Sequence, residues 1–198
     1  MSHGRKLTVL VDSVKKLIRR DDYKHVVRIL KKVHSADIAH VLSNLRNDER
    51  IRLTQVLCEV DLKLAAATIS ELGPELGDEL LDIIPEHLLI RILQEMEPDD
   101  AALFVSNLEP GKAQKILSQM RAEDSESVRD LLQYEAKTAG RIMNSDVFAL
   151  HQDLTVTEAI QTIQQRRDAA VHFYLYVTDQ EGHLVGVLSL KQLLLNRP

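Results

Sequence analysis

The chain contains 198 residues with a formal net charge of −5, of which 44% are hydrophobic, 28% charged and only 4% aromatic. This composition supports a core of packed aliphatic side chains and excludes a disordered polar segment. The single cysteine, Cys58, excludes an internal disulfide framework and fits a reducing compartment. No apolar run approaches the roughly 20 residues that a spanning helix needs, so we expect no membrane span in this chain.

The charges are unevenly distributed along the chain. Residues 1–36 contain ten basic and three acidic residues, whereas residues 37–198 contain fifteen basic and twenty-seven acidic residues. Apolar stripes predict two amphipathic helices, over 7–18 and 23–33, whose polar faces account for the basic residues. Ser35 is the expected N-cap of the next helix. The acidic remainder argues against nucleic acid as a partner and favours hard cations.

A repeat of short helical units follows. Four prolines, at positions 74, 85, 98 and 110, stand at the starts of units, where their missing N–H is tolerated. Each unit predicts a helix of about two to three turns, which cannot bury its apolar stripe alone. We therefore predict a helical-repeat superhelix. The apolar residues that close the units, at steps of 12, 15, 12, 12, 12 and 12, are Leu45, Leu57, Leu72, Ile84, Met96, Leu108 and Met120.

The pattern changes after residue 133. We predict a strand near 147–150, then a helix opened by a capping box of Thr155 and Glu158, and an aromatic strand over 173–177. A tight turn at Glu181-Gly182 leads to another strand and to a closing helix over 190–195. The fold class is thus mainly α: a helical N domain over 1–133, followed by a small α/β domain over 134–198.

The segments "AGRIM", "LTVTEAI" and "YLYVTDQEGHLVGVLSLKQLL" resemble a CBS motif covering residues 138–196. CBS motifs normally work in pairs, so this resemblance implies a missing second motif or pairing across a homodimer. Together with "MEPDDAALFVSNLEP" and "YEAKTAGRIM", the chain resembles the cytosolic N-terminal region of MgtE-type magnesium transporters.

This second resemblance implies a soluble fragment on the cytoplasmic side of the cell membrane. In the family, a superhelical N domain precedes two CBS motifs and a transmembrane pore domain. The implied role is to sense Mg²⁺ at acidic domain interfaces and to favour the closed pore when magnesium is abundant.

The resemblance also implies candidate ligands for Mg²⁺. Asp99 and Asp100 match the acidic helix start of the family, although their alternative role is capping and compensation of the helix dipole. Leu103 occupies a position where the family often carries a further acid. Glu135 and the backbone of Gly140 match the stretch of the first CBS motif that faces the N domain. The alternatives are plain solvation for Glu135 and a close turn at Gly140.

Some CBS motifs bind adenosine nucleotides through a Ser or Thr and an Asp three residues later, which holds the ribose hydroxyls. Here Ser189 is present, but Gln192 occupies the Asp position. A neutral amide cannot accept both hydroxyls as a carboxylate does. Ser189 and Gln192 are therefore weak nucleotide candidates, and we expect adenosine nucleotide binding to be disfavoured.

Catalytic motifs are missing from the sequence. It contains no P-loop and no GxSxG motif, and Cys58 lies within a helical unit that predicts a buried thiol. We therefore expect no enzyme. The alternative function is a soluble CBS-containing adaptor that binds an adenosine nucleotide and a protein partner. The histidines are dispersed without HxxxH or HExxH spacing, which argues against a transition-metal site: His3, His25, His34, His40, His87, His151, His172 and His183.

Overall fold

The computed structural model describes residues 3–144, 147–165 and 173–195, which divide into two compact units, 1–145 and 146–198. Most of the described helices of the first unit are too short to be stable in isolation, so they depend on their neighbours. The described helices are α1 (His3–Ile18), α2 (Tyr23–Leu30), α3 (Ser35–Ser43), α4 (Asn47–Val60), α5 (Leu62–Ser70), α6 (Pro74–Ile83), α7 (Glu86–Leu93), α8 (Pro98–Asn107), α9 (Pro110–Gln119), α10 (Ala122–Leu132) and the 3₁₀ helix η1 (Gly140–Ile142).

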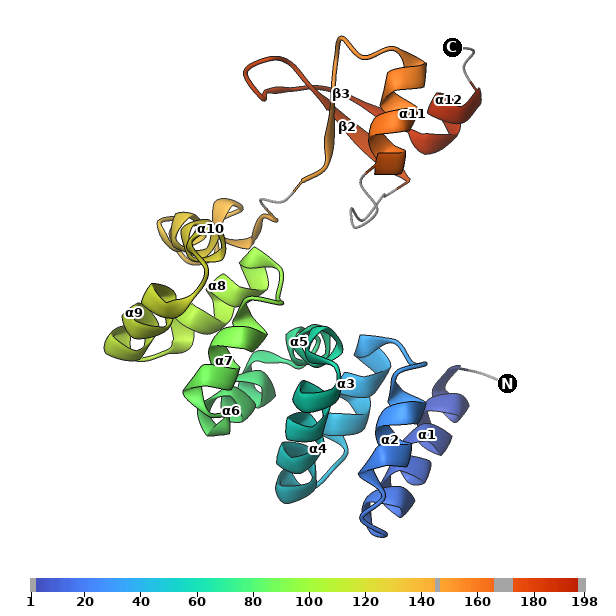
Figure 1. The fold of residues 1–198 in the computed structure, drawn as a ribbon, viewed down its shortest axis with the longest axis vertical. Coiled ribbons are helices and arrows are strands. Elements are labelled where there is room, and N and C mark those ends of the chain that lie inside the picture. Colours follow the sequence, from blue (N-terminus) through green and yellow to red (C-terminus); the bar gives the residue numbers. More distant parts are fainter. Residues whose placement is uncertain (1–2, 145–146, 166–172, 196–198) are drawn as a thin grey trace. The chain divides into compact units, whose positions relative to one another are not determined.

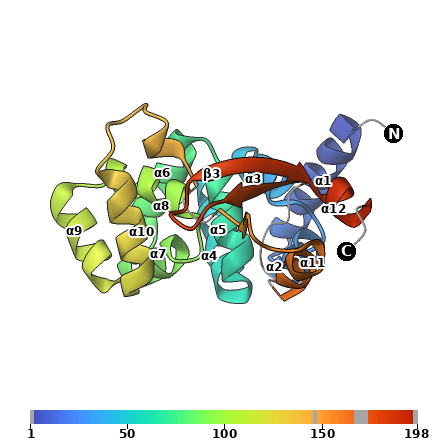
Figure 2. The same ribbon diagram turned by 90° about the horizontal axis from the view of Figure 1, so that it is seen from above.

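The helices of the first unit stack as a superhelix, as the sequence predicts (Figure 1). Most helices pack against the next helix but one, and Figure 2 shows this for α8 and α10. One continuous aliphatic core runs through the unit. Its largest fully buried side chains are Leu30, Ile38, Leu42, Leu53, Leu57, Ile69, Leu80, Leu81, Leu89, Ile92, Leu93 and Ile116.

The twelve-residue repeat is confirmed from α6 to α10. These helices begin at Pro74, Glu86, Pro98, Pro110 and Ala122, so each start follows the previous one by twelve residues. Polar pairs add to the packing between helices two apart, including Asn107 of α8 with Asp78 of α6 at 2.9 Å. The strict period means that the starts of these helices are structurally equivalent positions.

Two predicted details are wrong. Leu57 does not close a unit, because α4 contains no proline or glycine and continues to Val60, after which Asp61 caps the next helix. Ser35 is the first residue of α3 rather than its N-cap. The N-cap is His34, whose Nδ1 accepts a hydrogen bond from the Ala36 amide at 3.3 Å. An imidazole nitrogen thus replaces the expected hydroxyl.

The second unit is a three-stranded sheet in the order β1-β2-β3, with helices on one face (Figure 1). β1 (Ala149–His151) pairs in parallel with β2 (Tyr174–Thr178), and β2 pairs in antiparallel with β3 (Leu184–Ser189). α11 (Val156–Gln165) and α12 (Leu190–Leu195) cover the face that carries Leu150 and Leu175. β1 begins at Ala149, two residues later than predicted, and is therefore shorter.

Both predicted local signals of this unit are confirmed. Thr155 and Glu158 form the capping box of α11: the Thr155 amide donates to Glu158 Oε2 at 2.9 Å, and the Glu158 amide donates to Thr155 Oγ1 at 3.3 Å. Gly182 turns the β2–β3 hairpin with a φ of +83°, a conformation that favours glycine. The domain boundary predicted after residue 133 stays a prediction. In the described part of the chain, no helix has the length and apolar character needed to cross a bilayer.

Candidate functional site

Asp99 and Asp100 lie in the first turn of α8, directly after Pro98. Both are half-buried, and the N-cap residue, Glu97, forms no side-chain capping bond. Acidic side chains in this position interact favourably with the helix dipole. Both carboxylates can therefore compensate the helix dipole, which is the alternative to binding Mg²⁺.

The repeat shows what is unusual about this helix start. From N-cap to third residue, the starts of α6 to α10 are GPEL, PEHL, EPDD, EPGK and RAED, so among these five helices α8 alone has three acids in four positions. In α10 the N-cap residue is Arg121, which forms an ion pair with Asp124. The equivalent residues of α8 are Glu97 and Asp100, which carry like charges. The α8 start thus lacks the cation that its counterpart in α10 has.

Burial and negative charge combine at this position. Burial raises the pKa of Asp100, and the neighbouring carboxylates of Asp99, Glu97 and Glu71 raise it further, while a hydrogen bond from Ser70 opposes the shift. Asp99 Oδ1 is buried and has no hydrogen-bond partner among the described residues. A buried carboxylate oxygen without a partner is costly, because it loses its hydration. The carboxylates repel one another at this position, and a nearby cation would relieve that repulsion.

The segment after α10 returns to this helix start. Asn144 Nδ2 donates a hydrogen bond to Glu97 Oε2 at 3.1 Å. Glu135 lies just beyond α10 and is exposed, and Gly140 begins η1. A Cβ atom at Gly140 would lie 2.7 Å from Cε1 of Tyr134, so the packed ring requires glycine there. This close approach supports the alternative role of Gly140, as a residue needed for local packing.

Sequence reasoning identified Asp99 and Asp100 but not the acids that surround them. Glu71 follows α5 and approaches Asp100 from a distant part of the sequence, which no local pattern reveals, whereas Glu97 is the N-cap residue of α8 itself. The described residues of this region do not form a group of three ligand atoms within 4.8 Å of one another. The assignments of Asp99, Asp100, Glu135 and Gly140 as Mg²⁺ ligands stay predictions.

A cavity of about 300 Å³ lies within the second unit. Its polar wall consists of His151, Gln152, Thr155 and Gln192, and the remaining lining residues are apolar. The cavity is thus an apolar pocket with a few polar groups, which is the usual form of a small-molecule site.

The two nucleotide candidates have a structural role in this unit. The Ser189 amide and hydroxyl both donate to Gln192 Oε1 at 2.9 Å, and the Gln192 amide donates to Ser189 Oγ at 3.1 Å. This is a second capping box, at the start of α12. The carbonyl oxygen of Gln192 therefore already accepts two hydrogen bonds, while its side chain borders the cavity. Their role in nucleotide binding stays a prediction.

One cluster of metal-ligand side chains was missed by sequence reasoning. Among the described residues, Asp179, Glu181 and His183 bring ligand atoms within 4.8 Å of one another. A search for paired histidines could not find it, whereas its signal is the D-x-E-x-H spacing across a turn. Cys58 is buried, and burial raises the pKa of its thiol to about 11, as an inert thiol requires. His172 lies outside the described residues.

Curated relatives resemble almost the whole chain. A protein described as magnesium transporter MgtE from Thermus thermophilus is 28% identical over 193 residues, which are 96% of this chain and 42% of the relative. Its namesake from Bacillus subtilis is 26% identical over 183 residues, which are 92% of this chain and 40% of the relative. The chain thus spans about two fifths of the length of these relatives.

Two solved structures share the fold. The soluble part of a magnesium transporter superposes with a TM-score of 0.83 at 24% identity, covering 96% of this chain and 75% of that one. The cytosolic domain of the Mg²⁺ channel MgtE in complex with ATP has a TM-score of 0.82 at 27% identity, covering 95% and 76%. The CBS domain family matches residues 139–197, and the MgtE intracellular N domain family matches residues 33–137. The chain therefore belongs to the MgtE intracellular N domain family and carries a CBS domain after it.

Proposed function

We propose that the chain is the cytosolic Mg²⁺-sensing region of an MgtE-type magnesium transporter or channel. Its role is regulatory rather than catalytic, and it lies on the cytoplasmic side of the membrane that holds the pore of the whole protein. Family membership and the two transporter relatives support this assignment. In this proposal Mg²⁺ binding to the sensor favours the closed pore.

The observation that carries the proposal is the buried, unpartnered Oδ1 of Asp99 beside the Asp100 carboxylate. Mg²⁺ binds oxygen ligands, keeps several waters and is usually held by one or two carboxylates. The α8 start offers carboxylate oxygens only, so its chemistry fits this ion. Bound Mg²⁺ would supply the positive charge that the Glu97 position lacks in comparison with Arg121 of α10.

The residues around the helix start have distinct roles in this proposal. Asp99 and Asp100 hold the ion, and Ser70 orients the Asp100 carboxylate through its hydrogen bond. Glu135 and the backbone of Gly140 remain proposed further ligands, because their segment returns to the α8 start. In this proposal, a second acidic surface of the assembled protein contributes the remaining ligands. Because cellular magnesium is millimolar, each site needs a binding free energy of only about −4 kcal/mol.

The first prediction concerns heat stability. About 10 mM MgCl₂ is expected to raise the melting temperature of the chain by roughly 2–4 °C, because it is a tenfold excess over a Kd of about 1 mM and stabilises by about 1.4 kcal/mol. The Asp99→Asn, Asp100→Asn double variant should show no Mg²⁺-dependent increase. Melting is followed by circular dichroism, and NaCl of matched ionic strength serves as the salt control.

Glu123→Gln provides the matched control variant, because Glu123 occupies in α10 the repeat position of Asp99 in α8. It should keep the full Mg²⁺-dependent increase. A double variant that still responds like the parent would remove Asp99 and Asp100 from the mechanism.

The second prediction concerns pH. The pKa of Asp100 is raised above its ordinary value of 3.8, so the folded state binds more protons than the unfolded state above that pH. Stability without Mg²⁺ should therefore fall as the pH rises through the raised pKa. Asp100→Asn is expected to increase the free energy of unfolding at pH 7, with a gain that vanishes towards pH 4.

Urea unfolding at several pH values measures this effect. Asp124→Asn is the matched control, because it removes an ion pair with Arg121 and should lower stability slightly, by about 0–1 kcal/mol. If Asp100→Asn were destabilising at pH 7, the carboxylate would be satisfied without a cation.

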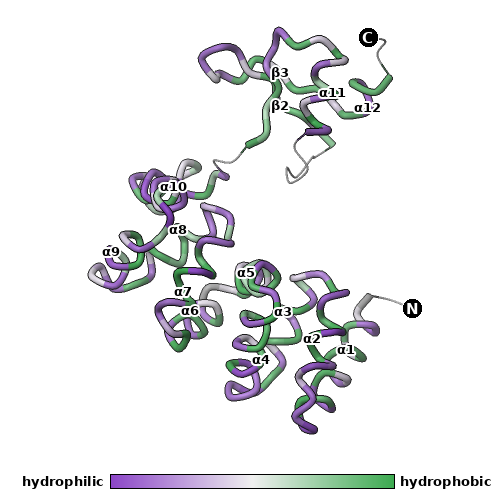
Figure 3. The backbone as a smooth tube through the Cα atoms, in the orientation of Figure 1, coloured by the Kyte–Doolittle hydropathy of each residue, from purple (hydrophilic) through white to green (hydrophobic). Residues whose placement is uncertain are grey.

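We also propose that the CBS sheet is covered by another CBS motif, from the second motif of the parent protein or from a second copy in a homodimer. The face opposite the helices carries Tyr174 and Tyr176 on β2 and Val187 on β3, all exposed. Figure 3 shows that both strands are largely hydrophobic. An exposed apolar face of this kind marks an interaction surface.

The third prediction tests self-association. Tyr174→Lys should shift sedimentation equilibrium towards the monomer, because a charge in the centre of a buried apolar contact is costly. Val60→Lys is the control, since Val60 is comparably exposed on α4 (51% against 65%). If the unsubstituted chain is monomeric at high concentration, a second copy is excluded as the partner of this sheet. The second CBS motif of the whole protein then remains as the partner.

A nucleotide-dependent adaptor is the second candidate function, because the second unit contains the cavity and one solved relative was crystallised with ATP. We infer that Gln192 makes adenosine nucleotide a weak ligand here. The fourth prediction is that Gln192→Asp strengthens ATP binding by about tenfold, as charged hydrogen bonds contribute about 1.5–3 kcal/mol.

Isothermal titration calorimetry measures this change. Gln152→Asp is the control, because Gln152 also lines the cavity and the variant adds the same charge. Tight ATP binding by the parent chain would favour the adaptor over the magnesium sensor.

A further inference from the structure

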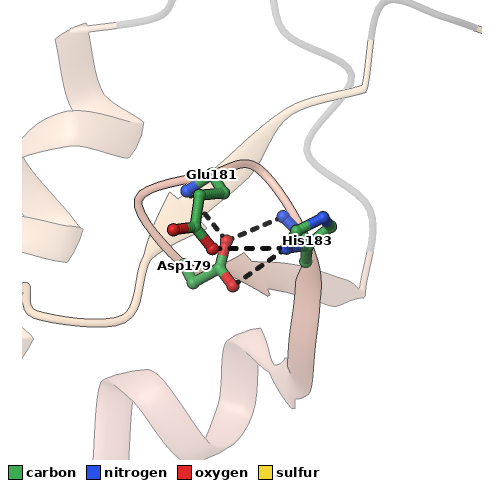
Figure 4. A group of neighbouring side chains, drawn as sticks. All are labelled: Asp179, Glu181 and His183. Carbon is green, nitrogen blue, oxygen red and sulfur yellow. Dashed lines mark hydrogen bonds and ion pairs between the residues drawn. The ribbon is translucent and has the colours of Figure 1, made fainter.

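The β2–β3 hairpin gathers three ligand side chains within five residues, on an exposed hydrophilic turn (Figure 3). Figure 4 shows Asp179, Glu181 and His183 pointing toward one another. Asp179 Oδ1 accepts hydrogen bonds from the amides of Glu181 at 3.0 Å and His183 at 2.8 Å. These bonds hold the turn and leave Oδ2 facing the imidazole. The Asp179 carboxylate is thus held by backbone amides, and the turn places the side chains of Glu181 and His183 beside it.

Two separations within the group are compatible with metal ligands and are longer than a short charge-assisted hydrogen bond, although the first also lies within hydrogen-bond distance. His183 Nδ1 lies 3.3 Å from Asp179 Oδ2 and 3.6 Å from Glu181 Oε2. Two ligands bound tetrahedrally at about 2.0–2.1 Å from one zinc ion lie about 3.3 Å apart. A charge-assisted hydrogen bond is shorter, about 2.7–2.9 Å. His25 Nδ1 and Asp22 Oδ2, at 2.7 Å, show such a bond elsewhere in this chain.

The chemistry of the donors selects the ion. Two carboxylates balance the charge of a divalent cation, and the imidazole adds a nitrogen ligand that suits zinc and its neighbours rather than magnesium. Glu181 and His183 are mostly exposed, so water can complete the coordination shell. We propose that Asp179 Oδ2, Glu181 Oε2 and His183 Nδ1 form a binding site for a divalent first-row transition-metal ion such as Zn²⁺, separate from the α8 acids.

Zinc titration of the full chain tests the proposal. Calorimetry with ZnCl₂ in a millimolar excess of MgCl₂ should detect one site. His183→Ala and Glu181→Gln should each weaken it by about tenfold or more, since even outer-shell substitutions in metal sites cost 10–100-fold. Asp179 is left unchanged because it holds the turn. Nitrogen-detected NMR of the histidine side chains should show zinc on Nδ1 of His183.

His151→Ala is the matched control. His151 Nδ1 lies 3.5 Å from Asp153 Oδ2, so it offers a histidine–aspartate pair in the same unit without a third ligand. This variant should bind zinc within about twofold of the parent chain. The proposal is overturned if zinc does not bind, if His183→Ala leaves the affinity unchanged, or if magnesium displaces zinc at equal concentration.

Discussion

The structure of the first unit depends on the burial of short apolar stripes between helices two apart. A helix of about ten residues gains little from its own hydrogen bonds in water, so its stability comes from the neighbours against which it packs. From α6 to α10 the helices begin at a constant spacing of twelve residues, so their starts are equivalent positions in the repeat. The packing also brings the end of α5 close to the start of α8.

The positions that this packing does not constrain are the ones where residues can be chosen for function. The repeat requires apolar side chains on one face and tolerates many choices at the first turn. In α10 those positions hold Arg121 and Asp124, which pair with each other. In α8 they hold Glu97 and Asp100, which carry like charges, and the pKa of the half-buried Asp100 is raised by burial and by the neighbouring carboxylates. Ionised Asp100 at the α8 start is thus less favourable than a solvated carboxylate, and in the proposed function a bound divalent cation relieves this cost.

The sequence predicted the elements whose causes are local. The proline spacing gives the repeat, and the Thr155–Glu158 pattern gives a capping box, because both depend on residues a few positions apart. Leu57 was misjudged, since its apolar character does not show whether a helix ends there. Long-range features could not be predicted: Ser70 and Glu71 approach Asp100 from a part of the sequence that lies about thirty residues away. The Asp179–His183 group was local enough to predict, but only a search for mixed ligands across a turn would have found it.

The two candidate cation sites differ in their ligand atoms, and the type of ligand atom decides which ion binds. The α8 start offers oxygen atoms alone, which are the ligands that magnesium prefers. The hairpin adds a nitrogen ligand, and affinity for mixed nitrogen and oxygen sites rises along the first transition row. If both proposals hold, a transition-metal ion at trace concentration would occupy the hairpin while magnesium, in large excess, would occupy the carboxylates. Ligand chemistry, rather than the fold, would then separate the two sites.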